Sequence, residues 1–204
     1  MLPKFLFRLL AKHYRSPKGI LGRYVGQKMD SMNNKQNDWV LSLLNLRPAD
    51  RVLELGFGTG KTLKKVSKIV TTGRIYGVDS SETMYAAASR LLDKEISSGI
   101  VTLYKGDAEY LPDIRASITK IFAVHVVYFW KDLGEVFSQL FRLAAKNCLL
   151  AIYFVSPTIS PTTVFREYSK DEITRVLSLV GFKKADVKYR KFGKQNGICI
   201  LVRK

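Results

Sequence analysis

The sequence predicts an α/β fold in which a mostly parallel sheet is covered by helices on both faces. Short apolar runs alternate with stretches of helical periodicity, the pattern of consecutive βαβ units, and fall near residues 51–55, 74–78, 100–104, 119–125 and 147–155. The end of the chain differs, because two β-rich runs at 184–190 and 197–203 follow a helix near 169–180. Such closely spaced runs predict a terminal antiparallel pair.

Size and composition favour one substantial core. The chain has 204 residues, 47% of them hydrophobic, which is enough for a single domain. Its two cysteines, Cys148 and Cys199, lie in apolar runs without metal-binding spacing, so we expect a reduced, cytoplasmic protein and no metal site. No run approaches the roughly 20 apolar residues of a membrane-spanning helix. Lys4 and Arg8 interrupt the first apolar residues, which disfavours a signal peptide.

The formal net charge of +17 is concentrated at the two ends of the chain. Residues 1–37 contain eight Lys/Arg and one acid, and residues 183–204 contain the same numbers, so the long middle carries only +3. Either an anionic partner, such as a membrane surface, a nucleic acid or an acidic substrate, or simply a solvated basic surface explains this distribution.

The first 47 residues are predicted to form a helical segment ahead of the main domain. Residues 2–15 have an apolar stripe beside Lys4, Arg8, Lys12 and Arg15, which predicts a short amphipathic helix. Such a helix could contact an anionic membrane, cover an active site as a lid or dock on the core. A glycine-containing loop at 16–30 and a second helix from Met32 to Asn45 complete the segment.

Residues 51–60, Arg-Val-Leu-Glu-Leu-Gly-Phe-Gly-Thr-Gly, place glycines at the point where a strand gives way to a helix. Glycines there allow a sharp turn and a close approach of ligand to backbone. A P-loop would need Gly where Leu55 stands, and the dinucleotide pattern would need Gly where Lys61 stands. The spacing therefore excludes both of these phosphate-binding turns.

Carboxylates follow three successive predicted strands. Glu54 ends the first strand, Asp79 ends the second strand nineteen residues after Gly60, and Asp107 follows the third. Each alone could be a helix cap or a turn residue. Ligands of open parallel sheets bind beyond the carboxyl ends of the strands, so the three together predict a ligand site there.

The run Glu-Leu-Gly-x-Gly-x-Gly at 54–60 resembles motif I of class I S-adenosylmethionine (SAM) dependent methyltransferases. The resemblance extends from about Trp39 to Lys204 and is closest to the small bacterial ubiquinone/menaquinone and phospholipid-methylating enzymes. Residues 122–130 with Asp132 resemble motif IV and its successor, and the loop at 17–32 resembles the segment before motif I. It implies a Rossmann-like three-layer αβα fold, a seven-stranded sheet with an antiparallel last strand, a helical lid at 1–47 and a SAM-binding domain at 48–204.

The resemblance also implies a set of cofactor contacts. Asp79 would accept the ribose hydroxyls, Asp107 would face the adenine amino group and Met84 would pack on the adenine ring. The residues expected to contact SAM are Glu54, Gly56, Phe57, Gly58, Gly60, Asp79, Ser80, Met84, Asp107, Ala108, His125 and Val126.

His125 is a departure from the pattern, since relatives commonly have Asn or Asp at the end of strand four. It could act as a catalytic base or be a structural histidine at the edge of the cofactor. Tyr128 and Trp130 could form an aromatic wall of the acceptor site, whereas Phe129 is expected to pack in the core.

The function that follows is methyl transfer from SAM to a small-molecule or lipid-like acceptor, with S-adenosylhomocysteine as product. The alternatives are an RNA methyltransferase, which the charge favours, and a SAM-binding regulatory protein without turnover. The Asn-Pro-Pro-Tyr motif of many nucleic-acid amino methyltransferases is missing from the sequence, which disfavours a base as acceptor.

Overall fold

The computed structural model describes residues 33–155, 166–193 and 195–204. The amphipathic helix expected at 2–15 and the loop expected at 16–30 lie outside these residues, and so does the proposed lid in front of residue 33. The second expected helix is present over residues 33–44 and ends where Asn45 adopts a left-handed conformation (φ 48°). It buries Trp39, Val40 and Leu44 against the sheet.

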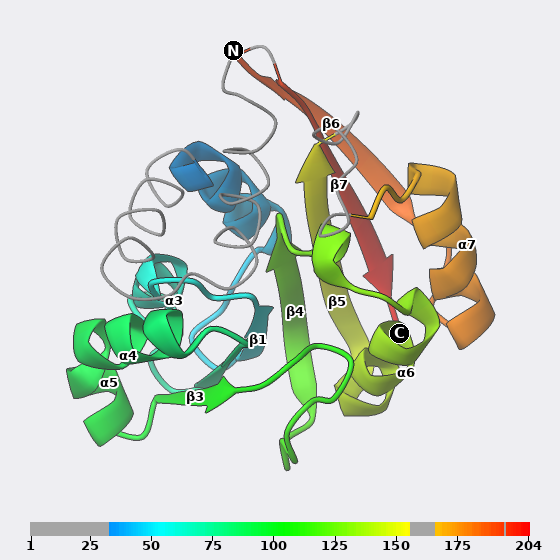
Figure 1. Cartoon of the computed structure of the whole chain (residues 1–204). Coiled ribbons are helices and arrows are strands. Elements are labelled where there is room, and N and C mark those ends of the chain that lie inside the picture. Colours follow the sequence, from blue (N-terminus) through cyan, green and yellow to red (C-terminus); the bar gives the residue numbers. More distant parts are fainter. Residues whose placement is uncertain (1–32, 156–165, 194) are drawn as a thin grey trace.

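Seven strands form one sheet in the order β3-β2-β1-β4-β5-β7-β6 (Figure 1). The strands are β1 Arg51–Leu55, β2 Arg74–Asp79, β3 Val101–Lys105, β4 Ile118–Val124, β5 Ala144–Val155, β6 Asp186–Phe192 and β7 Gln195–Arg203. β7 pairs antiparallel with both β5 and β6, while the pairs among β1 to β5 are parallel. The mostly parallel sheet with a reversed last strand is therefore confirmed.

Helices cover both faces of the sheet, as the alternating sequence pattern predicts. The connecting elements are α3 Lys61–Val66, α4 Glu82–Leu91, α5 Asp93–Ser97, the 3₁₀ turn η1 Val127–Phe129, α6 Leu133–Leu143 and α7 Lys170–Val180. The helix over 33–44, α3 and α4 pack on one face, and α6 and α7 pack on the other. Successive residues of a strand point to opposite faces of the sheet, so the sheet has a hydrophobic core on each face. Val52 of β1 packs in the core beneath the helix over 33–44, α3 and α4, and Leu53 packs in the core beneath α6 and α7.

Two boundaries differ from the sequence expectation for local reasons. β5 begins at Ala144 rather than near 147, because α6 runs into the strand without a loop. The β6 and β7 strands continue to Phe192 and Gln195, so the connection between them is shorter than the five residues that the sequence pattern indicates. By contrast α7 starts as expected: the Ser169 side chain accepts the Glu172 N–H at 3.0 Å, a cap that Ser-x-x-Glu spacing favours.

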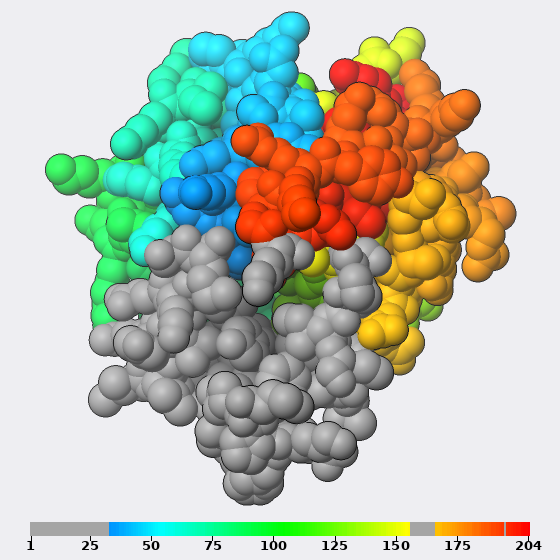
Figure 2. Space-filling view, turned by 90° about the horizontal axis from the view of Figure 1, so that it is seen from above, coloured from blue at the N-terminus to red at the C-terminus, as the bar shows by residue number. Residues whose placement is uncertain are grey.

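The hairpin end of β6 and β7 lies against the helix over 33–44, as the view from above shows (Figure 2). The Trp39 ring meets the Phe192 ring edge-on at 5.8 Å and the Tyr153 ring edge-on at 6.0 Å. Arg190 places its guanidinium carbon 5.3 Å from the Phe192 ring centre. This aromatic cluster joins the beginning of the described chain to its last hairpin, above the carboxyl end of β5.

We expect Gly77→Ala to destabilise the protein by about 1 to 3 kcal/mol through overpacking of the core. A Cβ on Gly77 would come within 2.7 Å of Phe57 and 2.8 Å of Leu63. Urea denaturation measures the effect. Gly106→Ala is the matched control, because its Cβ would meet nothing closer than 3.6 Å. Equal midpoints for the two variants would contradict the packing argument.

Candidate active site

The turn after β1 requires glycine at three positions. Gly56, Gly58 and Gly60 have φ values of 74°, 56° and 83°, in the left-handed region that other residues rarely adopt. Space is also restricted. A Cβ on Gly56 would lie 2.2 Å from a methyl group of Val126, and one on Gly60 would lie 2.9 Å from Ala88 of α4. The turn is therefore packed between the β4 end and α4.

Asp79, at the end of β2, is tied to this turn. Its Oδ2 accepts the Gly58 N–H at 2.8 Å and its Oδ1 accepts the Ser81 N–H at 2.8 Å. Ser81, and not Asp79, caps α4, since its side chain accepts the Met84 N–H. Burial raises the pKa of Asp79 to about 6, although the two backbone N–H groups act in the opposite direction. The side chain of Asp79 is thus held at the strand end by backbone N–H groups of the glycine turn and of the N-cap residue of α4.

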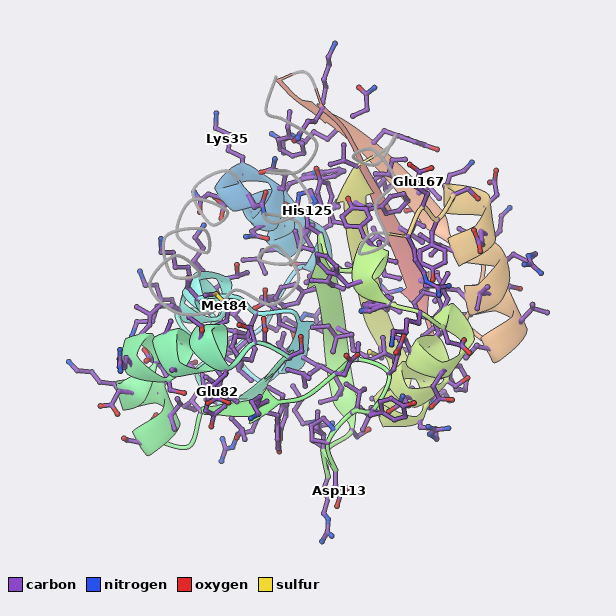
Figure 3. The ribbon with its side chains drawn as sticks, in the orientation of Figure 1. Lys35, Glu82, Met84, Asp113, His125 and Glu167 are labelled. Carbon is purple, nitrogen blue, oxygen red and sulfur yellow. The ribbon has the colours of Figure 1, made fainter. Side chains whose placement is uncertain are left out.

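A cavity opens above the carboxyl ends of β1, β2 and β4, where the sequence predicts a ligand site. Met84 on the first turn of α4 and His125 at the upper end of β4 border it (Figure 3). Most of the expected cofactor residues line this cavity: Glu54, Gly56, Phe57, Gly58, Asp79, Ser80, Met84, Asp107, Ala108, His125 and Val126. Gly60 is not among the lining residues, because its Cα faces Ala88 on α4.

The other two carboxylates of the cavity differ in their local roles. Glu54 is buried to 3% exposure, and the N-cap of α3 is Gly60 without a side-chain bond, so Glu54 does not cap that helix. Asp107 does take part in a turn, since its Oδ1 accepts the Glu109 N–H at 3.2 Å. The sequence alternative of a turn residue therefore applies to Asp107 alone, and Asp107 also lines the cavity.

His125 occupies a strained position at the end of β4, with φ 57°. Its backbone N–H donates to the Tyr153 carbonyl at 3.0 Å, and its ring meets the Tyr153 ring edge-on at 4.9 Å. Burial lowers the pKa of His125 to about 4, so the imidazole is neutral at physiological pH. A neutral imidazole borders the cavity in place of a charged one.

The Tyr128 hydroxyl lies beside that imidazole. Its oxygen accepts the backbone N–H of Val155 at 2.7 Å and lies 3.4 Å from Nδ1 of His125. Nε2 of His125 is buried and has no hydrogen-bond partner in the described part of the chain. Because a neutral imidazole has one N–H and one bare nitrogen, His125 carries one donor and one acceptor.

The aromatic residues after β4 divide differently from the sequence expectation. Trp130 lines the cavity as expected, but Tyr128 does not, because its hydroxyl is directed to Val155. Phe129, for which core packing is the expectation from sequence, does line the cavity. Tyr128 and Phe129 both lie in the 3₁₀ turn η1, where consecutive side chains point about a third of a turn apart, so the two face different sides.

Two side chains hold the backbone around Trp130. The Glu109 carboxylate accepts the N–H groups of Lys131 and Asp132, the second at 3.1 Å. From the other side, the Tyr168 hydroxyl donates to the Trp130 carbonyl at 2.7 Å. The cavity wall formed by Trp130 therefore depends on contacts from the β3–β4 loop and from the segment before α7.

Asn33, Asn37 and Thr62 also line the cavity, and sequence reasoning missed them. Asn33 and Asn37 are spaced i and i+4 on their helix, so they share one face. They also continue the stripe of the buried Val40 and Leu44, at i, i+4, i+7 and i+11, and two amides in such a stripe are the signal that could have identified them. Thr62, on the first turn of α3, has no comparable signal.

The charge of the cavity is opposite to that of the whole protein. Glu54, Asp79 and Asp107 contribute carboxylates, and none of the described lining residues is Lys or Arg. Within residues 33–155, 166–193 and 195–204, no cluster of His, Cys, Asp or Glu could hold a metal ion. SAM carries a sulfonium and an ammonium group and presents ribose hydroxyls, so carboxylates suit it as partners.

Comparison with known proteins agrees with this geometry. The methyltransferase domain family matches residues 52–147. An uncharacterized methyltransferase, YdaC of Bacillus subtilis, is 22% identical over 88% of this chain and 97% of its own length. The ubiquinone/menaquinone biosynthesis C-methyltransferase UbiE of Saccharophagus degradans is 31% identical over 65% of this chain and 57% of its own. A SAM-dependent methyltransferase structure from Aquifex aeolicus superposes with a TM-score of 0.71, at 21% identity, covering 89% and 97% of the two chains.

The fold, the glycine turn and these relatives define a class I Rossmann-like methyltransferase. The chain is a SAM-dependent methyltransferase, with SAM as its methyl donor. The alternative of a regulatory protein without turnover is therefore set aside. Across the described residues, the helices are too short or too polar to cross a membrane.

We expect His125 to remain neutral between pH 5.5 and 8, since burial lowers its pKa to about 4. NMR titration of its ring protons should show no inflection in that range, with the resonance assigned by its loss in His125→Asn. Asn is a suitable replacement, because it tolerates the left-handed backbone at this position. A midpoint near the roughly 6.5 of an exposed histidine would contradict the assignment.

Proposed function

We propose that the protein transfers the SAM methyl group to a small-molecule or lipid-like acceptor that enters beside His125, Phe129 and Trp130. The observation that carries the proposal is the composition of the cavity. Its polar lining is acidic or neutral and its far wall is aromatic, with no described Lys or Arg to receive a phosphate. An uncharged or cationic group with apolar surroundings suits such a lining better than a polynucleotide does.

The cofactor contacts follow from the strand ends. Asp79 would accept the ribose hydroxyls, because two backbone N–H groups already orient its carboxylate. The Gly56–Gly58 turn would face the methionine part of SAM, with Glu54 near its ammonium group. Asp107 would face the adenine amino group and Met84 would pack on the ring. Tight positioning of this kind is what an in-line methyl transfer chiefly requires.

The acceptor side supports catalysis by alignment. When bound, SAM supplies an electrophilic sulfonium methyl group. Neutral His125 offers an N–H donor that could orient an acceptor oxygen or nitrogen, and the aromatic wall would exclude water from the reacting atoms. A base at His125 would titrate near pH 4 and would have little driving force to remove a proton at neutral pH. We therefore assign His125 a positioning role in the cavity.

RNA remains the second candidate acceptor because the chain carries a net charge of +17. Turnover assays separate the two proposals. Isoprenoid quinone precursors and amino-headgroup lipids are offered in parallel with bulk RNA, and S-adenosylhomocysteine formation is measured. Methylation of RNA, with affinity that falls steeply as salt rises, would overturn the small-acceptor proposal. UbiE, named for ubiquinone/menaquinone biosynthesis, supports beginning with quinone-type acceptors.

We expect Asp79→Ala to weaken SAM and S-adenosylhomocysteine binding by about 2 to 4 kcal/mol, at about 1.5 to 3 for each charge-assisted bond less partial rescue by water. Isothermal titration calorimetry measures this loss. Glu82→Gln is the matched control, since it removes an exposed carboxylate from the first turn of α4. In the native protein, affinity should also fall as pH drops below about 6, where Asp79 takes up a proton. Unchanged affinity in Asp79→Ala would remove this residue from the site.

We expect Glu109→Gln to raise the KM of the acceptor several-fold while leaving the SAM affinity unchanged. The substitution weakens the charge-assisted bonds that hold the backbone beside Trp130, each worth about 1.5 to 3 kcal/mol. Steady-state kinetics and calorimetry provide the two readouts. Glu135→Gln on α6 is the control, because its carboxylate is exposed. Equal acceptor KM values for both variants would contradict an acceptor wall at Trp130.

A further inference from the structure

A recess lies at the amino ends of the central parallel strands, and the candidate active site lies at their carboxyl ends. Its walls come from the end of the helix over 33–44, the beginnings of β1 and β4, the bulged part of β5 and the end of β7. We call it the lower recess, and its polar residues are Asn45, Arg47, Asp50, Thr119, Lys120, Asn147 and Arg203. Asp113, on the loop that leads to β4, marks this lower side of the molecule, far from His125 (Figure 3).

Irregular backbone creates the lower recess. The pairing of β4 with β5 shifts between Ile118↔Ala144 and Lys120↔Leu149, so β5 contains extra residues opposite Thr119. Asn147 within this bulge has φ 65°, and Asn45 at the helix end has φ 48°. Bulges and left-handed residues of this kind commonly redirect side chains next to functional sites. Here they border the space that Arg47, Lys120 and Arg203 line.

Three cations surround the lower recess without carboxylate partners. Seven ion pairs occur among the described residues, and none of them includes Arg47, Lys120 or Arg203. Lys120 Nζ donates to the Leu44 carbonyl at 2.6 Å, and Arg203 donates to the Asn147 carbonyl at 3.3 Å. Neutral carbonyls satisfy some donors of these groups without neutralising their charges, and Asp50 is the one acidic residue among the described residues that line the recess.

Asp50, the acid of the recess, is already engaged on both oxygens. Oδ1 accepts a hydrogen bond from the Thr119 hydroxyl at 2.8 Å, and Oδ2 accepts one from the backbone N–H of Arg47 at 2.7 Å. It is also largely buried, at 9% exposure. Three cations against one carboxylate leave a local charge of +2, which a doubly charged oxyanion would balance.

The two guanidiniums also disfavour the charged form of Lys120. Burial lowers the pKa of Lys120, the carboxylate of Asp50 acts in the opposite direction, and the guanidiniums of Arg203 and Arg47 lower this pKa further. A charge cluster of one sign is unfavourable in the free protein. An anion bound among the three groups would remove this repulsion, so the free energy of binding would include its relief.

We propose that the lower recess binds a phosphate-type oxyanion, held by Arg47, Lys120 and Arg203. A guanidinium presents paired N–H donors that match the oxygens of a phosphate, and the ammonium of Lys120 adds a point charge with remaining donors. The ligand is inorganic phosphate or the phosphate monoester of a small molecule. The site is separate from the methyl-transfer cavity, whose polar lining suits a cationic cofactor.

Thermal unfolding at constant ionic strength tests the proposal on the full chain. Inorganic phosphate should raise the Tm more than chloride does, because a ligand that binds the native state stabilises it. Arg47→Gln and Arg203→Gln should each lower the phosphate affinity about tenfold or more, the equivalent of at least one charge-assisted contact. Arg175→Gln on α7 is the matched control and should retain full affinity. SAM affinity should be the same in all four proteins.

Glycerol 3-phosphate distinguishes the two sources of the oxyanion. Tighter binding of this monoester than of inorganic phosphate assigns the recess to a small phosphorylated molecule, and the reverse order assigns it to the free ion. Protection by phosphate no greater than that by chloride would overturn the proposal. An equal loss of phosphate affinity in Arg175→Gln would also overturn it, because the attraction would then be a general effect of the basic surface.

Discussion

The contact between the glycine turn and Asp79 is the constraint on which the cavity above the carboxyl ends of the strands depends. Gly58 donates its N–H to Oδ2 of Asp79 across two neighbouring strands, while Gly56 packs directly on Val126 beyond β4. Three strand ends are thereby locked to one another. Asp79, the turn and His125 can face a common cavity only because no side chain on the glycines separates them.

Two buried titratable groups line the cavity, and a fall in pH changes the free energy of unfolding in opposite directions through them. The folded-state pKa of His125, about 4, is below its ordinary 6.5, so its contribution to stability is lost as pH falls through that window. The pKa of Asp79, about 6, is above its ordinary 3.8, so protonation of Asp79 stabilises the fold as pH falls from 6 toward 3.8. The two effects partly cancel in mild acid.

The two ends of the parallel strands carry opposite charges. Carboxylates lie at the carboxyl ends of β1, β2 and β3, whereas Arg47, Lys120 and Arg203 lie together on the side of the amino ends. The net charge of +17 is thus not repeated in the cavity, because none of its described lining residues is Lys or Arg. A basic protein can accordingly bind a cationic cofactor, because local side chains and not the total charge set the potential inside a cavity.

The sequence alone determined the fold class and the end of the strands, the carboxyl end, at which the cofactor site lies. Alternating hydrophobic periods specify strands and helices because each side chain's burial follows from its position in the repeat, and Glu54, Asp79 and Asp107 follow from strand ends. Tertiary structure decided the rest. Gly60 packs on α4, Tyr128 turns to Val155 and Phe129 faces the cavity, because side-chain direction in turns depends on contacts distant in sequence. The lower recess has the same origin: Arg47, Lys120 and Arg203 meet only through the bulge in β5 and the pairing of the last strand.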